Sequence, residues 1–131
     1  MRFSVSGDRV KVTPSLREYI DRRLYFALGR FGAAIDHVNV RVGDVNGPRA
    51  GGVDKHCQIV VKLRTSGSNS IAVDDHDQNL RAAVARASSR AGRTVARAVE
   101  RKRHKRAYQR RRMLAEDGSR TMHVDGQEDL G

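Results

Sequence analysis

Apolar and polar residues alternate in four short stretches of the chain, a period typical of half-buried β-strands. Phe3 and Val5 alternate with polar neighbours as far as Gly7-Asp8, where we expect the first strand to end. The fourth stretch is the shortest, and we expect it to end at Asp74-Asp75. The apolar positions of the second, third and fourth stretches are Val38, Val40 and Val42; Cys57, Ile59, Val61 and Leu63; and Ile71 and Val73.

Between the first two strands the apolar period changes to that of a helix. Thr13 is a favourable N-cap, and Pro14 suits a first helical position because its missing N–H has no partner there. The apolar residues then fall at steps of three and four and form one stripe. Gly29 and Gly32 mark its end, and the stripe comprises Leu16, Tyr19, Ile20, Leu24, Ala27, Leu28 and Phe31.

A second helix is predicted after the fourth strand, with Asp77 as its cap. Its apolar stripe is rich in alanine, so the helix should lie close to the sheet. Gly92 should weaken it by about 1 kcal/mol relative to alanine. The stripe continues for about five turns and comprises Leu80, Val84, Ala87, Ala91, Val95 and Ala98.

The remaining segments lack an apolar period. Gly43–Asp54 and Ser66–Asn69 contain the residues of a long loop and a turn. The basic run Glu100–Arg112 has no apolar face, so we expect frayed helix or disorder until it meets an anion. The acidic tail Met113–Gly131 is expected to be unstructured. We expect one folded domain over residues 1–106 and a disordered tail, first basic and then acidic, over residues 107–131.

The predicted elements follow the order β-α-β-β-β-α. This order indicates an α+β fold, a four-stranded sheet with two helices packed on one face, because each amphipathic helix must bury its stripe against the sheet. The layout resembles that of double-stranded-RNA-binding folds. We therefore expect a small scaffold with one core and an exposed helical surface.

The charge of the chain points to an anionic partner. The net charge is +11 and the isoelectric point is near 11.0, far beyond what solubility requires. Residues 1–99 carry a net charge of +8, residues 100–112 carry +7 and residues 113–131 carry −4. Nucleic acid or an anionic membrane surface would match this charge, and the excess lies in the domain as well as in the basic run.

Arginines follow the second helix on the side away from its apolar stripe. A solvated helix usually intersperses glutamates as ion-pair partners, yet no acidic residue lies between Asp77 and Glu100. We interpret this ridge as a phosphate-binding surface; simple solvation is the alternative. The ridge comprises Arg81, at its edge, and Arg86, Arg90, Arg93, Arg97 and Arg101.

The sequence offers little for catalysis or metal binding. Cys57 is the only cysteine and occupies an inward strand position, and the five histidines share no metal-ligand spacing with one another or with it. Asp74, Asp75 and Asp77 could hold a cation but are better explained as a turn and a helix cap. No phosphate loop or paired catalytic acid is present. We expect no enzyme activity, catalytic residue, metal, cofactor or small-molecule substrate.

The chain begins without an apolar signal core, and it contains no apolar run long enough to span a bilayer. We therefore expect a cytoplasmic protein that does not use a membrane as its partner. A structural role, in which the basic run docks on a protein or membrane surface, is a further hypothesis that liposome binding without RNA binding would favour.

The segment Val10–Leu24 resembles the front of the ribosome hibernation promoting factor and ribosome-associated inhibitor family. Its sequence is Val-Lys-Val-Thr-Pro-Ser-Leu-Arg-Glu-Tyr-Ile-Asp-Arg-Arg-Leu. It combines the end of a strand, a Thr-Pro helix cap, a Leu-Arg-x-Tyr motif and a pair of arginines. The resemblance covers roughly residues 1–106. It departs at Asp77–Ala83, where family members usually open the last helix with an Asp-Met-Tyr-like segment. The chain is closer to the short members, with an added basic extension and acidic end.

This resemblance implies a protein that binds rRNA in the mRNA and tRNA channel of the small ribosomal subunit and stops translation by occupying it. Arginine contacts to several phosphates would give tight, salt-sensitive binding selected by rRNA shape. On this basis we expect charge reversal of Arg90 and Arg93 together to abolish ribosome binding and to leave the fold intact. The predicted RNA-binding residues are Arg22, Arg23, Arg30, Arg86, Arg90, Arg93, Arg97, Arg101, Lys102, Arg103, Lys105 and Arg106.

The alternative function is a general module for structured RNA or DNA, for example in ribosome assembly. Such a module would bind free duplex as tightly as intact subunits.

Overall fold

The computed structural model describes residues 1–44, 55–64 and 70–125. Its element order is the predicted β-α-β-β-β-α, with one 3-10 helix added after the first helix. The expected loop between residues 45 and 54 and the turn over residues 66–69 lie outside the described residues. The elements are β1 (Arg2–Asp8), α1 (Pro14–Leu28), η1 (Gly29–Ala34), β2 (Ile35–Asp44), β3 (Lys55–Leu63), β4 (Ser70–Asp77) and α2 (Leu80–Asp125).

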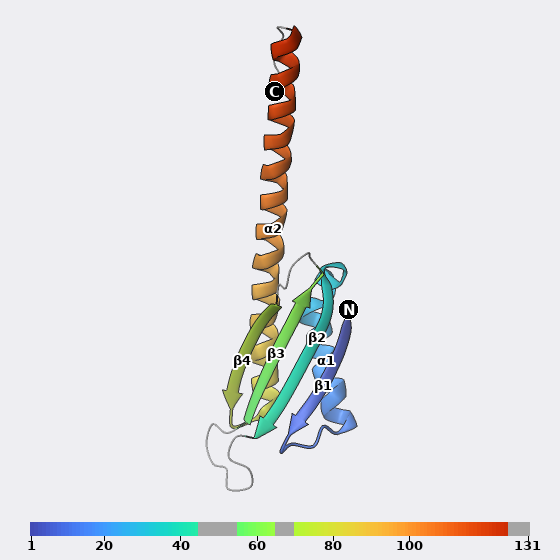
Figure 1. The fold of residues 1–131 in the computed structure, drawn as a ribbon. Helices are drawn as coiled ribbons and strands as arrows, with labels where there is room; N and C mark the ends of the chain where they lie inside the picture. Colours follow the sequence, from blue (N-terminus) through green and yellow to red (C-terminus); the bar gives the residue numbers. More distant parts are fainter. Residues whose placement is uncertain (45–54, 65–69, 126–131) are drawn as a thin grey trace. The chain divides into compact units, whose positions relative to one another are not determined.

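The four strands form one mixed sheet in the order β1-β2-β3-β4. β1 pairs parallel with β2, while β2 and β3, and β3 and β4, pair antiparallel. Figure 1 views the sheet with α1 and the first turns of α2 behind it, so both helices cover the same face. This confirms the predicted α+β class, and no helix of the described residues covers the opposite face of the sheet, which we call the uncovered sheet face.

The core lies between the sheet and the two helices, and the predicted period of two supplies its strand residues. Side chains of β2 and β3 that alternate toward the helices are fully or almost fully buried, as are those of the two helical stripes. The fully buried side chains with the largest volumes are Ile20, Leu24, Leu28, Ile35, Ile59, Val38, Val40, Val42, Val61, Val84, Val95 and Cys57.

Helix α1 begins where the sequence predicts. The Thr13 hydroxyl accepts a hydrogen bond from the Leu16 amide at 3.2 Å, which satisfies one of the first unpaired donors of the helix. Pro14 occupies the first turn. The helix ends at Leu28, and the chain continues as η1 from Gly29.

The predicted end of the first strand is confirmed, since β1 ends at Asp8, and Gly7 and Asp8 pair with Val42 and Gly43. Two other predicted boundaries are wrong, because strand pairing extends beyond the alternating apolar residues. β2 therefore includes Gly43 and Asp44, which the sequence had suggested for the loop. β4 does not end at Asp74-Asp75 but reaches Asp77, the partner of Lys55. Backbone hydrogen bonds to a neighbouring strand hold these polar residues in place.

The predicted cap of α2 is also wrong. Asn79 Oδ1 accepts a hydrogen bond from the Arg81 amide at 2.9 Å, so Asn79 is the N-cap of a helix that starts at Leu80. Asp77 lies two residues earlier and accepts from the Asn79 amide at 2.8 Å. It shapes the turn that leads from β4 into the cap.

The chain divides into two compact units, Met1–Ala96 and Arg97–Gly131. The first unit contains the sheet, α1 and the first part of α2. In the second unit, α2 continues to Asp125, so the basic run and the beginning of the acidic tail are helical rather than irregular. The division into a domain over residues 1–106 and a tail over residues 107–131 stays a prediction.

Candidate nucleic-acid interface

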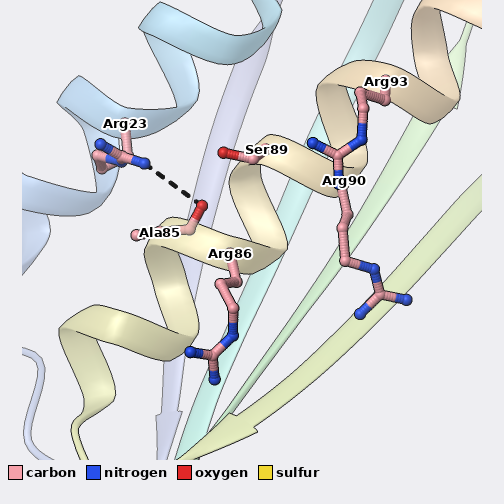
Figure 2. A pocket seen from close by; sticks show the side chains of 6 residues that line it. All are labelled: Arg23, Ala85, Arg86, Ser89, Arg90 and Arg93. Atoms are coloured by element: carbon pink, nitrogen blue, oxygen red, sulfur yellow. Dashed lines mark hydrogen bonds between the residues drawn. The ribbon is translucent and has the colours of Figure 1, made fainter.

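A pocket of about 260 Å³ is lined by four arginines from α1 and α2. All of its residues belong to the first unit. Figure 2 shows Arg23 on α1 and the other side chains on the neighbouring turns of α2. We call it the arginine pocket, and its lining residues are Arg23, Ala85, Arg86, Ser89, Arg90 and Arg93. The structure thus brings together four of the twelve predicted RNA-binding residues.

Arg23 reaches the pocket because it lies beside the buried stripe of α1. Leu24, the next residue, is fully buried against the sheet, which turns the Arg23 side chain toward α2. Its Nη2 donates to the carbonyl oxygen of Ala85 at 3.4 Å. Its Nε is closed to solvent and has no hydrogen-bond acceptor within the described part of the chain, so any contact with a ligand in the pocket falls to the terminal nitrogens of this guanidinium group.

Arg86 is held by the end of β4. Its Nη2 lies 3.1 Å from Asp75 Oδ1 and 2.7 Å from Asp77 Oδ2, and it donates to the His76 carbonyl oxygen at 2.8 Å. In Figure 2 this guanidinium group extends away from Arg23. Most of its donors are therefore already used within the protein.

Arg90 shares the same carboxylate. Its Nη1 lies 3.5 Å from Asp75 Oδ2 and donates to the carbonyl oxygen of Asp74. Asp75 can meet both arginines because it pairs with the buried Cys57 in the sheet, which places it on the helix-covered face. The missing acidic partners of the ridge thus come from the adjacent strand rather than from the helix itself.

These contacts shift the pKa values of both carboxyl groups. Partial burial raises the pKa of Asp75, but the hydrogen bonds and charge of Arg86 and the His76 amide outweigh it and hold that pKa below its usual range. The pKa of Asp77 is lowered by the Asn79 amide and by Arg86. Both carboxylates in turn raise the pKa of Arg86. Asp75 and Asp77 therefore act as anions that orient arginines, and Asp77 does so in addition to its role in the turn.

Arg93 differs from its two neighbours on α2. It is exposed, and no hydrogen bond or ion pair joins it to another residue of the described segments. Ser89, also exposed, adds a hydroxyl to the pocket wall. The arginine pocket therefore combines two positioned guanidinium groups, Arg86 and Arg90, with two that retain donors for an anionic ligand, Arg23 and Arg93.

The other predicted site residues lie outside the pocket. Arg22 is exposed on α1 and pairs with Glu18 at 2.7 Å, and the Arg30 guanidinium lies 4.7 Å from the centre of the Phe31 ring. Those of the second unit all lie on α2, and only Lys102 among them is partly buried. They are Arg97, Arg101, Lys102, Arg103, Lys105 and Arg106.

Arg81, at the edge of the predicted ridge, connects the helices instead. Its Nη2 donates to the Ser15 hydroxyl at 3.1 Å, and its guanidinium carbon lies 4.8 Å from the centre of the Tyr19 ring. The Tyr19 hydroxyl donates to the Arg81 carbonyl oxygen at 3.2 Å. These contacts confirm that Tyr19 belongs to helix packing.

Sequence reasoning missed the role of Asp75 and the exposure of Phe26, whose side chain is 89% exposed. Asp75 was missed because its partners are 11 and 15 residues away, on another element. Phe26 carried a usable signal, since it is a large apolar residue that falls off the predicted apolar stripe of its helix. The neighbouring Tyr25 contacts the Phe3 ring edge-on, yet it is 67% exposed.

Cys57 is fully buried, as predicted for a core residue. Burial, with the charges of Asp74 and Asp75, raises the pKa of its thiol to about 12. None of the helices within the described segments has the length and apolar character needed to cross a membrane.

Known structures share this fold. The N-terminal domain of Protein Y from Thermus thermophilus has 22% sequence identity and a TM-score of 0.60, covering 74% of this chain and 98% of that chain. A ribosomal subunit interface protein from Coxiella burnetii has 15% identity and a TM-score of 0.64, covering 76% of this chain and 99% of that chain. At such identities the likeness concerns the fold. No curated protein matches the chain in sequence.

The mixed four-stranded sheet with two helices on one face makes this an α+β protein with the fold of these two structures. The chain belongs to the sigma 54 modulation protein / S30EA ribosomal protein family, whose model matches residues 3–103. This confirms the resemblance to ribosome hibernation factors. The matched region contains all four arginines of the arginine pocket and ends before Lys105 and Arg106.

Proposed function

We propose that this ribosome hibernation factor binds small-subunit rRNA in the mRNA and tRNA channel and inhibits translation by occupying it. The observation that carries the proposal is the arginine pocket, where Arg23 has one backbone hydrogen bond and Arg93 has no partner among the described residues, beside two arginines fixed by carboxylates. Family membership supplies the ribosome as partner. The remaining predicted arginines of both helices and the basic run would extend the contact along the RNA.

Binding by this surface needs no chemical reaction. Each phosphate that an arginine neutralises releases counterions, so a few such contacts give high affinity that falls steeply with salt. Arginine suits this role because its planar group can donate two parallel hydrogen bonds to one phosphate. Inhibition would follow from exclusion, since a bound domain and an mRNA or tRNA cannot occupy the same channel.

The test is cosedimentation of the purified full-length protein with small subunits at two salt concentrations. We expect Arg93→Glu to lose binding, because it replaces an unpaired guanidinium in the pocket by a carboxylate. Arg41→Glu is the matched control, with the same change of charge on an exposed residue of the uncovered sheet face. Unchanged binding of Arg93→Glu at moderate salt would contradict the proposal, and loss confined to Arg41→Glu would assign binding to the sheet.

The effect of Arg93→Glu on binding is easier to interpret than that of the double charge reversal of Arg90 and Arg93. A glutamate at position 90 would face Asp75, which now lies 3.5 Å from the Arg90 guanidinium, and the repulsion would weaken the packing of α2 on β4. Loss of binding would then have two explanations. The single change at Arg93 breaks no hydrogen bond or ion pair within the described residues.

Occupation of the channel is tested by competition. Subunits already loaded with mRNA and tRNA should bind the protein much more weakly than empty subunits, and saturating protein should stop translation of a reporter mRNA. Equal binding to loaded and empty subunits would place the contact elsewhere on the subunit. Binding to free RNA duplex as tight as to subunits would favour the general RNA-binding alternative.

A further inference from the structure

Phe26 is the most exposed large apolar side chain among the described residues. Its side chain is 89% exposed, although the chain contains only three phenylalanines. No ring contact joins it to another aromatic or cationic group of the described segments, whereas Tyr25 packs edge-on against Phe3 with 6.1 Å between ring centres. The Phe26 ring is thus available to a partner outside the chain.

Three arginines flank Phe26 along the chain. Arg22 and Arg23 lie one turn earlier on α1, at spacings that make them neighbours of Phe26 on the helix surface. Arg30 follows four residues later, in η1, with its guanidinium group over Phe31. Arg23 also lines the arginine pocket. The exposed ring therefore projects from a helix segment rich in arginine, one turn after a residue of the candidate phosphate site.

An occupant of this surface must combine a flat apolar face with negative charge. A single-stranded nucleic acid has both, because an unstacked base presents a π-face while its backbone carries phosphates. We propose that Phe26 stacks on an unpaired nucleobase whose neighbouring phosphates are bound by the adjacent arginines. This inference rests on the proposed function, and it adds a base contact to a surface that otherwise binds phosphates alone.

A stacking contact would change which RNA structures the protein prefers. Phosphate contacts are made equally by duplex and single strand, whereas a ring can stack only on a base that is not already stacked in a helix. Phe26 would therefore favour rRNA positions with a splayed base over regular duplex. It would not read the identity of the base, since every base has a π-face.

A tryptophan at this position provides a direct readout, because the chain contains no other tryptophan. We expect the fluorescence of Phe26→Trp in the full-length protein to be quenched by a short oligouridylate. An abasic oligomer of the same length and charge should quench it far less. Equal quenching by the two oligomers, or none by either, would overturn the stacking proposal. Quenching by anionic phospholipid vesicles in place of the oligouridylate would overturn it in favour of a membrane surface.

Affinity for small subunits gives the second readout. Phe26→Leu keeps an apolar side chain but loses the flat face, so its affinity should fall roughly 5- to 150-fold, the range implied by stacking on one base. Phe26→Tyr should bind as wild type, and Tyr25→Leu, a change at the adjacent exposed aromatic residue, should have little effect. Full affinity of Phe26→Leu would overturn the inference.

The experiments distinguish a failure of the proposed function from a failure of the stacking proposal. Wild-type protein that does not bind subunits would overturn the proposed function, while the oligomer titration would still decide on stacking. Wild-type protein that binds subunits, with Phe26→Leu equally tight, would leave the proposed function standing and reject the stacking contact. Because Phe26 is exposed, its variants should unfold at the wild-type temperature, which circular dichroism can check.

Discussion

At the scale of single residues, Asp75 and Asp77 divide the predicted arginine ridge into two kinds of side chain. Arg86 and Arg90 form ion pairs with these carboxylates and donate hydrogen bonds to backbone carbonyls of β4. Arg93 has no such partner within the described residues. A guanidinium group fixed in this way loses less conformational freedom when it contacts a ligand. The carboxylates also lower the net positive charge around the pocket.

The depressed pKa values of Asp75 and Asp77 predict a pH dependence of folding stability. A carboxyl group whose pKa is lower in the folded state stabilises the fold above its unfolded value, near 3.8, and that stabilisation is lost as the pH falls through the folded value. Thermal unfolding should therefore show wild-type protein more stable than Asp75→Asn at pH 6. The difference should shrink below about pH 3.8. A difference that is constant with pH would contradict the ion-pair role.

At the scale of elements, the two helices approach each other closely at Gly92. A Cβ atom built there would lie 2.9 Å from the Ala27 carbonyl oxygen and 3.4 Å from the Ala27 Cβ. The oxygen belongs to the backbone of α1, so it cannot move without shifting the helix. Gly92 is therefore a contact point between α1 and α2, and its low helix propensity is the cost of that contact.

Gly92→Ala should destabilise the protein, although alanine is the better helix former. The gain in helix propensity is about 1 kcal/mol, while overpacking at a well-packed contact costs about 1 to 3 kcal/mol. We expect a net loss of roughly 1 kcal/mol by denaturant unfolding. Gly32→Ala is the control, because a Cβ at Gly32 meets nothing within 4 Å. A higher unfolding midpoint for Gly92→Ala would show that the helices separate easily.

At the scale of the whole molecule, the positive charge is shared between the two units. The net charge is +11, and the basic run of residues 100–112 contributes +7 of it. Family similarity ends at residue 103, so part of this run lies beyond the matched region. The basic run would add salt-sensitive affinity to the contact made by the arginine pocket.

Neutralising the basic run should therefore weaken binding without affecting the core. For Arg103, Lys105 and Arg106 changed together to glutamine, we expect the slope of log affinity against log salt to fall by roughly one for each phosphate that the protein no longer neutralises. The thermal unfolding of the first unit should not change. The matched control neutralises three exposed cations of the uncovered sheet face, Arg2, Arg41 and Lys62. Equal slopes for both triple variants would show that the run adds only general charge.

The sequence by itself determined the element order, the core faces and the start of α1. The core faces follow from the alternation at Val38–Val42 and at Cys57–Leu63 and from the helical stripe between Leu16 and Leu28. This is because local backbone geometry fixes which residues of a strand or helix share a face. The Thr13-Pro14 cap depends on adjacent residues only. The same reasoning placed the arginines on the exposed side of α2 but could not say which of them have partners.

Tertiary structure alone decided the details of the site. Strand pairing extended β2 and β4 past their apolar residues, and the register of β4 on β3 placed Asp75 opposite Cys57 and against Arg86 and Arg90. The approach of α1 to α2 brought Arg23 to the pocket. These are contacts between residues far apart in the chain, and their geometry depends on how the elements pack, which no local pattern of residues encodes.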